Sequence, residues 1–299
     1  MKAEHLFAVV TALLISSCWG GTDPETTNDK APELVIGGDG TDEAVASLYQ
    51  MPTPNELFSL VRNLVGDGQK RLLNPTSNAD KYASLRSRAV NFGVYSTDLV
   101  YASYYKLNVE VARYYLTTKK IAGELGIAAA FNDADFVRLE ANLTRGDSLE
   151  VISNDVYAKA YSKLQDEQMG PVLCMVLAGG WVESMHLLVS HVAGAGKSEA
   201  LVERVAEQKV TLEHLIELMA AHEADPEVAA LLKDLTTIRD VYDQVNVKRI
   251  AHQGTSASGR MVLGDDVQIE LTDEKFQALV AAVHELRARM IAPEDKTNA

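Results

Sequence analysis

Apolar residues along most of the chain recur three or four positions apart, which is the spacing of one face of an α-helix. Caps, prolines and glycines divide this pattern into segments. Thr53-Pro54-Asn55-Glu56 opens the first helix, and Gly66-Asp67-Gly68 stops it. The further helices that we expect cover about residues 79–107, 108–125, 133–143, 147 to before 170, 170–196, 198–224 (one or two helices), 225–245 and 272–292.

One segment alternates between apolar and polar residues instead. Residues 261–271 do so around Gly264-Asp265, which predicts a small β-hairpin with its turn at this pair. Residues 253–259, which precede it, are expected to form a polar loop. The sequence therefore predicts a mostly α fold, a bundle of about nine or ten helices with one small β-hairpin near the C-terminus. Since no Pro/Gly/Ser linker interrupts residues 49–292, we expect them to form a single helical domain, followed by a disordered tail over residues 293–299.

The composition indicates a globular chain and excludes some classes of binding partner. Of the 299 residues, 47% are apolar, and 28 Lys and Arg stand against 42 Asp and Glu, for a formal charge of -14. Nucleic-acid binding needs clustered basic residues, so an acidic chain of this kind is not expected to bind nucleic acid. The same charge disfavours electrostatic docking on anionic lipid.

The N-terminus has the pattern of a secretory signal. A charged start with Lys2 precedes an apolar run over residues 6–15, which is too short to span a bilayer comfortably. Leu14-Ile15-Ser16-Ser17-Cys18 resembles a bacterial lipobox, in which the Cys becomes the first mature residue and carries the lipid. We therefore predict a signal peptide over residues 1–17, and a lipidated Cys18 with a flexible tether over residues 18–48.

Lipidation of Cys18 would leave Cys174 as the only other cysteine, so no intramolecular disulfide could form. Cys174 lies in an apolar stretch and is expected to be a small core residue. Trp19 stands where an Asp would indicate inner-membrane retention in enterobacterial lipoproteins, so by that resemblance we expect an outer-membrane lipoprotein, on either the periplasmic or the surface face.

The helix over residues 170–196 is apolar nearly all round, which is typical of a central buried helix. Its remaining stripe is formed by Gly179, Glu183, His186 and Ser190. This stripe either forms the solvent edge of the helix or lines an inner polar cavity. In the second case Glu183 and His186, together with acidic and His residues of the 198–224 helix, could hold a metal ion, although we assign no metal ligands and expect no cofactor.

A similar polar stripe, Asn91, Tyr95 and Asp98, lies on the 79–107 helix, next to several tyrosines. Clustered tyrosines can form the wall of a ligand site, but they are also common at core and boundary positions. We predict as ligand-binding residues Asn91, Tyr95, Asp98, Gly179, Glu183 and His186.

Several short motifs resemble an uncharacterised family of helical lipoproteins from Bacteroidota over about residues 50–290. The motifs are Asn74-Pro75, Lys81-Tyr82, Asn91-x-Gly93-x-Tyr95-x-x-Asp98 and Leu177-Ala178-Gly179-Gly180-Trp181-Val182-Glu183. Because this family has no assigned activity, the resemblance implies a fold and a compartment but no catalytic residues.

The leading hypothesis is a lipid-anchored protein of the cell envelope that acts as a non-enzymatic binding or scaffolding module. Its partners would be the membrane, through the N-terminal lipid, and a small molecule or an envelope protein. The alternative is an envelope hydrolase or metal-dependent enzyme that uses Glu183 and His186 as acid, base or ligand. A third hypothesis is a subunit of a larger membrane complex, which would leave an apolar patch exposed on the isolated domain.

Overall fold

The computed structural model describes residues 57–58, 61, 64, 66–130, 133–142, 149–166, 168–195, 198–244, 246–251, 254–255, 261–262 and 265–294. Contacts divide the chain into two units, Met1–Gly38 and Asp39–Ala299, and every described residue lies in the second unit. The predicted signal peptide, the lipidated Cys18, the tether and most of the first helix lie outside the described residues.

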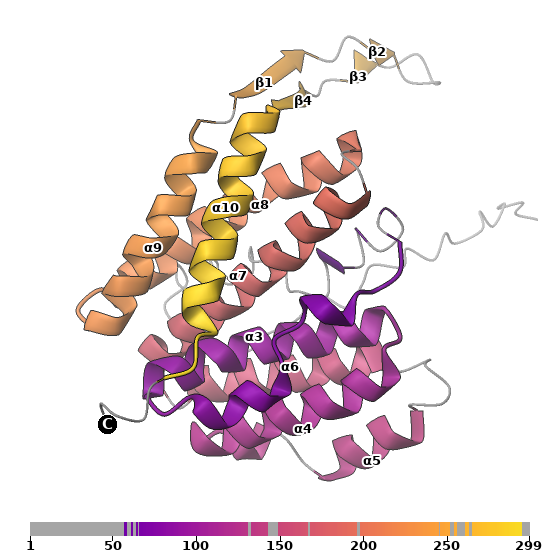
Figure 1. The fold of residues 1–299 in the computed structure, drawn as a ribbon. Helices are drawn as coiled ribbons and strands as arrows, with labels where there is room; N and C mark the ends of the chain where they lie inside the picture. The colour runs from indigo at the N-terminus through magenta and orange to yellow at the C-terminus, as the bar shows by residue number, and fades with distance from the viewer. Residues whose placement is uncertain are drawn as a thin grey trace, which may run out of the picture. The chain divides into compact units, whose positions relative to one another are not determined.

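The described part of the chain is mostly helical and contains eight α-helices, fewer than the nine or ten expected for the whole chain (Figure 1). They are α3 (Leu85–Tyr104), α4 (Asn108–Glu124), α5 (Asp133–Asn142), α6 (Leu149–Asp166), α7 (Gly170–Ala195), α8 (Glu199–Ala220), α9 (Pro226–Tyr242) and α10 (Asp273–Met290). Three short 3₁₀ helices accompany them: η1 (Lys70–Leu72), η2 (Thr76–Lys81) and η3 (Ala128–Ala130).

Helix α7 is the centre of this arrangement. It packs against α3 and α6 on one side and against α8, α9 and α10 on the other, while α4 packs on the outer side of α3 (Figure 1). Residues 172–189 of α7 are all buried, which confirms the expectation of a central helix. The helix is apolar over most of its length because the core of the domain surrounds it.

Two glycines allow α3 and α7 to approach closely. A Cβ atom added at Gly93 would lie 2.0 Å from the carbonyl oxygen of Val176, and one at Gly179 would lie 2.0 Å from that of Val90. No side chain fits at such a distance, so the backbones of α3 and α7 are in direct contact at these two points. This contact is the compensation for placing a glycine in the middle of a helix.

Several helix ends follow the sequence signals. The side chains of Ser198, Asp225 and Thr272 accept hydrogen bonds from the first turns of α8, α9 and α10. Gly126 has a φ of +80° just after α4, where glycine is the favoured residue.

Helix α3 is shorter than predicted. The prediction began it at residue 79, but that position belongs to η2, and Ser84 caps α3 by accepting a hydrogen bond from Ser87 N. The carboxylate of Glu294, from beyond the end of α10, accepts hydrogen bonds from the backbone N–H groups of Ala83 and Ser84. These N–H groups are therefore satisfied by a distant residue and not by a continuing helix, which no local pattern could have indicated.

Four strands lie between α9 and α10: β1 (Asn246–Ala251), β2 (Gly254–Thr255), β3 (Met261–Val262) and β4 (Asp265–Glu270). β1 pairs with β4 and β2 with β3, both antiparallel and in one continuous register. The predicted turn at Gly264-Asp265 is therefore wrong, because β3 and β4, on either side of it, each pair with an earlier strand and not with each other. Alternation within one segment predicts strands but does not identify their partners.

Candidate functional site

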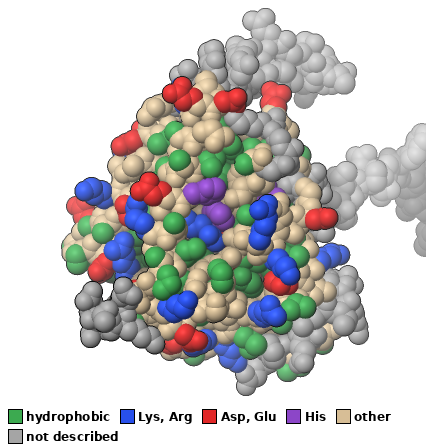
Figure 2. Space-filling model, viewed as in Figure 1, with side chains coloured by type: hydrophobic (Ala, Val, Ile, Leu, Met, Phe, Trp, Pro, Cys, Tyr) green, Lys and Arg blue, Asp and Glu red, His purple; other side chains and the backbone are tan. Residues whose placement is uncertain are grey.

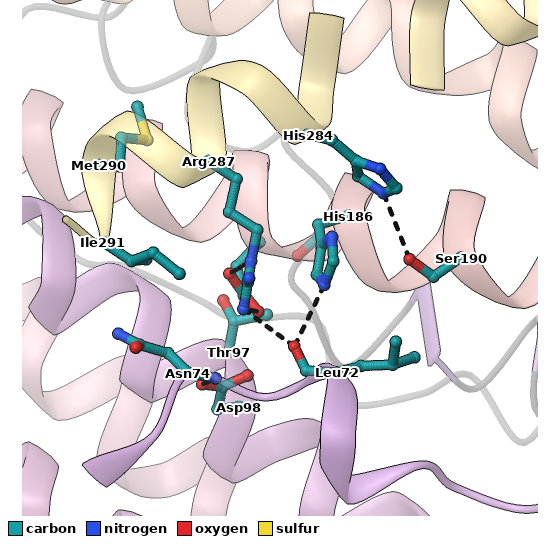
Figure 3. Close-up of polar contacts among 12 residues, drawn as sticks. Leu72, Asn74, Thr97, Asp98, His186, Ser190, His284, Arg287, Met290 and Ile291 are labelled. Atoms are coloured by element: carbon teal, nitrogen blue, oxygen red, sulfur yellow. Dashed lines mark hydrogen bonds and ion pairs between the residues drawn. The ribbon is translucent and has the colours of Figure 1, made fainter. Parts of the chain in front are cut away.

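A buried ion pair joins α7 to α10 at the centre of the candidate site. Arg287 Nε donates to Glu183 Oε2 at 2.6 Å and Arg287 Nη2 donates to Glu183 Oε1 at 2.8 Å, so the pair is bidentate. The Glu183 side chain is fully buried and that of Arg287 is 11% exposed. Nη2 also donates to the carbonyl oxygen of Leu72 at 2.9 Å, which fixes the end of η1 against both helices (Figure 3).

Asp98 of α3 brings a second carboxyl group to the same place. It is fully buried, and its carboxyl is close enough to that of Glu183 for the two groups to shift each other's pKa. Burial and then the charge of Glu183 raise the pKa of Asp98 well above its usual range, and these effects outweigh Arg287 and the N–H of Asn74, which act to lower it. Burial also raises the pKa of Glu183, against the opposing effect of Arg287.

The hydrogen bonds of the two carboxyl groups indicate which of them holds a proton. Asp98 Oδ2 accepts from the backbone N–H of Asn74 at 3.0 Å, whereas Oδ1 receives no donor among the described residues. Glu183 already accepts from Arg287 at both of its oxygens. We infer that Asp98 is protonated at Oδ1 and donates to the Glu183 carboxylate, which leaves one negative and one positive charge in the cluster and makes it neutral.

Asn74 connects this cluster to the tyrosines and to the end of α10. Its side-chain amide nitrogen donates to the Tyr82 hydroxyl at 3.1 Å and to Asn91 Oδ1 at 3.3 Å, and its backbone carbonyl oxygen accepts from the Tyr114 hydroxyl at 2.8 Å. Asn91 in turn donates to the carbonyl of Met290 at 2.9 Å. Polar side chains thus satisfy backbone groups at the C-terminal end of α10 that helix geometry leaves unpaired.

The tyrosines of the site act as hydrogen-bond donors. Tyr95 donates to the carbonyl oxygen of Pro75 at 2.9 Å, and Tyr82 donates to that of Ile291 at 3.1 Å. Burial is the main cause that raises the pKa of Tyr82, Tyr95 and Tyr114, and it raises the pKa of Tyr101 to about 12. These hydroxyls therefore stay protonated near neutral pH.

Two histidines of α7 lie around the network in neutral form. His186 Nε2 is 3.1 Å from the carbonyl oxygen of Leu72, and burial followed by the charge of Arg287 lowers the pKa of His186 to about 3. His191 Nε2 is 2.7 Å from the hydroxyl of Tyr101, and burial lowers the pKa of His191. A third histidine, His284 of α10, is an exposed residue whose ring lies beside that of His186 (Figure 3).

The structure brings five of the predicted residues near one another and uses most of them internally. Asn91, Asp98 and Glu183 belong to one hydrogen-bonded network, and Tyr95 packs against Tyr82 and Tyr114 within it. Of the two orientations considered for the polar stripe of α7, the inward one is observed, since Glu183 is fully buried and His186 is 9% exposed. Gly179 is in backbone contact with α3, and Cys18 lies outside the described residues. Ligand binding by these residues stays a prediction.

Sequence reasoning missed Arg287, which balances the buried charge, and gave Asn74 and Tyr82 no role in the site. A signal for Arg287 did exist. The buried apolar residues of α10 include Val283, Leu286 and Met290, and Arg287 falls on the same helix face, four residues after Val283 and three before Met290. A basic residue on an apolar helix face indicates a buried charge that needs a partner.

Comparisons with known proteins do not identify the site. No protein-family model matches the chain, and neither the curated proteins nor the solved structures contain a significant match. Within the described ranges one helix, Gly170–Ala193, is long and apolar enough to cross a membrane, and its most apolar stretch is buried among the other helices.

Proposed function

We propose that this chain is a lipid-anchored protein of the cell envelope, on the outer membrane, whose helical domain acts as a non-enzymatic binding or scaffolding module. The N-terminal pattern that ends in Cys18 supports the anchor. The motifs that resemble helical lipoproteins from Bacteroidota agree with this compartment.

One observation carries the non-enzymatic part of the proposal. The groups best suited to acid–base chemistry, Asp98 and Glu183, are fully buried and are engaged with each other, with Arg287 and with the backbone of Asn74. A general acid or base must reach the atom that gives or takes its proton. Carboxyl groups in this position instead hold α3, α7 and α10 together, which suits a rigid module.

The alternative of an envelope hydrolase or metal-dependent enzyme meets an energetic obstacle at Glu183. To serve as acid, base or ligand, Glu183 would have to leave Arg287, to which both of its oxygens are bound. Separating a buried ion pair of this kind costs about 3–5 kcal/mol. Catalysis through Glu183 is therefore disfavoured, whereas His186 stays available for binding.

The anchor is tested by comparing two single-cysteine variants of the full chain, produced in the native envelope. Cys18→Ser removes the proposed lipid attachment site, whereas the control Cys174→Ser removes the thiol that is buried in α7. With radiolabelled palmitate, we expect the wild type and Cys174→Ser to carry label and to partition with detergent, and Cys18→Ser to do neither. Equal labelling of Cys18→Ser would overturn the anchor.

The binding role is tested by native mass spectrometry of the lipidated chain, purified in mild detergent. A reproducible added mass or a stoichiometric partner chain, lost in a high-salt wash and restored on remixing, supports a binding or scaffolding module. A chain that is monomeric and without added mass, both after purification and after cross-linking in intact cells, would contradict it.

A further inference from the structure

Two histidines from different helices face each other at the outer edge of the buried network. The ring centroids of His186 (α7) and His284 (α10) are 5.0 Å apart, with an interplanar angle of 60°. His284 Nε2 is 3.4 Å from the hydroxyl oxygen of Ser190, one turn further along α7. Figure 3 shows the three side chains gathered on the same side of Arg287, and Figure 2 shows histidine side chains that reach the surface on the face viewed.

His186 has one ring nitrogen in use and one that is free. Because the carbonyl oxygen of Leu72 can only accept, His186 Nε2 carries the hydrogen of that contact, and Nδ1 is left with a lone pair. Nδ1 is buried and has no hydrogen-bond partner in the part of the chain that the structure describes, and the whole residue is only 9% exposed. An unsatisfied buried acceptor costs about 1–3 kcal/mol, so a ligand that binds to this lone pair would remove that cost.

The surroundings of His186 are those of a metal-binding histidine. Such a residue binds the ion through one nitrogen and donates the N–H of the other to a backbone carbonyl or a carboxylate, which fixes the tautomer and the ring orientation. Here the carbonyl of Leu72 has that role, and the same oxygen is held in place by Arg287. The free nitrogen is therefore positioned before any ion binds.

The separation of the two rings fits one shared ion. With metal–nitrogen bonds of about 2.0–2.1 Å and a ring centre about 1.2 Å behind each nitrogen, two imidazoles at an angle of about 90–109° have centroids about 4.6–5.3 Å apart. The observed 5.0 Å falls within this range. His284 is exposed, so its ring can turn to direct a nitrogen at the ion without a change in the fold.

We propose that His186 Nδ1 and a ring nitrogen of His284 bind one divalent transition-metal ion such as Zn²⁺, Ni²⁺ or Cu²⁺, with water and the Ser190 hydroxyl available for the remaining positions. Imidazole nitrogens suit these ions, whereas Mg²⁺ and Ca²⁺ prefer oxygen ligands. The described residues contain no cluster of three or more His, Cys, Asp or Glu that could hold a metal. The site is accordingly an open one with two protein nitrogens, which exchanges its metal, and not a closed structural centre.

The charges around the two rings permit this assignment. Burial and then the charge of Arg287 lower the pKa of His186 and of His284, so both disfavour a proton on either ring. The bidentate pairing of Arg287 with Glu183 offsets this charge at the position of a bound ion. The proposal goes beyond the lipid-anchored module proposed above, and neither depends on the other.

The test uses the full chain in detergent, stripped of metal with a chelator, and a matched pair of histidine variants. His284→Ala removes a ligand from an exposed position of α10, so the fold should be kept. The control His214→Ala removes a half-buried histidine of α8 whose Nδ1 likewise has no hydrogen-bond partner among the described residues. Titration calorimetry with Zn²⁺ should give one site in the wild type, an affinity lower by about tenfold or more in His284→Ala, and no change in His214→Ala.

Electron paramagnetic resonance of the Cu²⁺ form provides a readout that a structural role would not change. We expect nitrogen splitting from two imidazoles in the wild type and from one in His284→Ala. Equal Zn²⁺ affinity of the wild type and His284→Ala, or less than one ion bound by the wild type at saturating Zn²⁺, would overturn the site. So would a Cu²⁺ spectrum that His284→Ala leaves unchanged.

Discussion

Replacing Asp98 by Asn tests whether the carboxyl pair in the core holds a proton. In the folded protein the Asp98 Oδ2 atom accepts from the N–H of Asn74, and Oδ1, which receives no donor among the described residues, is the atom that we infer to carry the proton shared with Glu183. An asparagine reproduces this pattern, because its carbonyl can accept from Asn74 and its NH₂ can donate to Glu183. The variant is a permanent copy of the protonated aspartic acid.

The direction of the pKa shift determines how the stability difference between Asp98→Asn and the wild type changes with pH. Burial raises the pKa of Asp98 in the folded state, so the stability that its proton provides is fully present below the unfolded pKa of about 3.9 and is lost as pH rises through the folded pKa. Between these two values, each pH unit removes about 1.4 kcal/mol from the wild type. Asp98→Asn cannot titrate and escapes this loss, so its stability relative to the wild type should increase with pH at up to that rate.

Urea denaturation at a series of values from about pH 5 to pH 8 measures this difference. We expect Asp98→Asn to be within about 1 kcal/mol of the wild type at the acid end and to be the more stable protein at the alkaline end. The control Asp234→Asn alters a carboxylate that pairs with Arg289 at the surface, where ion pairs contribute little. If Asp98→Asn were destabilised by more than about 2 kcal/mol at every pH, with the wild-type slope, Asp98 would be ionised and the inference refuted.

A double-mutant cycle with Glu183 sharpens the test. In Glu183→Gln the proton can leave Asp98, which becomes the anion that balances Arg287, so the cost is limited to one charge-assisted hydrogen bond, about 1.5–3 kcal/mol. The double variant Asp98→Asn/Glu183→Gln has no anion in the cluster. It should lose more than the sum of the single losses, by about 1 kcal/mol or more. Additive losses would mean that the two carboxyl groups do not share a charge.

Three further outcomes follow from the structure. Gly93→Ala should destabilise the protein by about 3 kcal/mol or more in thermal or urea unfolding, since its Cβ would lie 2.0 Å from the oxygen of Val176. The matched Gly180→Ala should be tolerated, because the added Cβ would lie 3.4 Å from the hydroxyl oxygen of Thr97, and an equal effect would refute the close contact. Burial raises the pKa of the Cys174 thiol to about 12, so it should react with a thiol reagent only at the rate of unfolding, and rapid reaction in native buffer would contradict this. Burial acts to raise the pKa of Glu294, but its hydrogen bonds to residues 83 and 84 outweigh this and lower it. Glu294→Gln should therefore lose stability above about pH 5, with a deficit that shrinks as the pH falls through the folded pKa, and a deficit independent of pH would exclude this role.

Local signals in the sequence were sufficient for much of the helical architecture. Ser198, Asp225 and Thr272, the first residues of three of the expected helical ranges, cap α8, α9 and α10, and Gly126 follows the expected end at residue 125. These ends could be predicted because capping involves only residues a few positions apart. The all-round apolar pattern of residues 170–196 also indicated that this helix lies at the centre. The polar stripe around Glu183 was recognised, but not its orientation.

Contacts between distant segments decided the rest. Arg287 is 104 positions from Glu183, and Glu294 is 210 from Ser84, and periodicity contains no information about such pairs. The start of α3 depended on Glu294, and the inward side of the polar stripe depended on Arg287. The partners of the strands likewise depended on pairing between distant segments. Among the described residues, the sequence alone thus determined most of the helical segments and which of them is central, since helix period and capping are local. Only the tertiary structure decided that two carboxyl groups share one guanidinium in the core and that two histidines meet at its edge, because these side chains come from three helices brought together by packing.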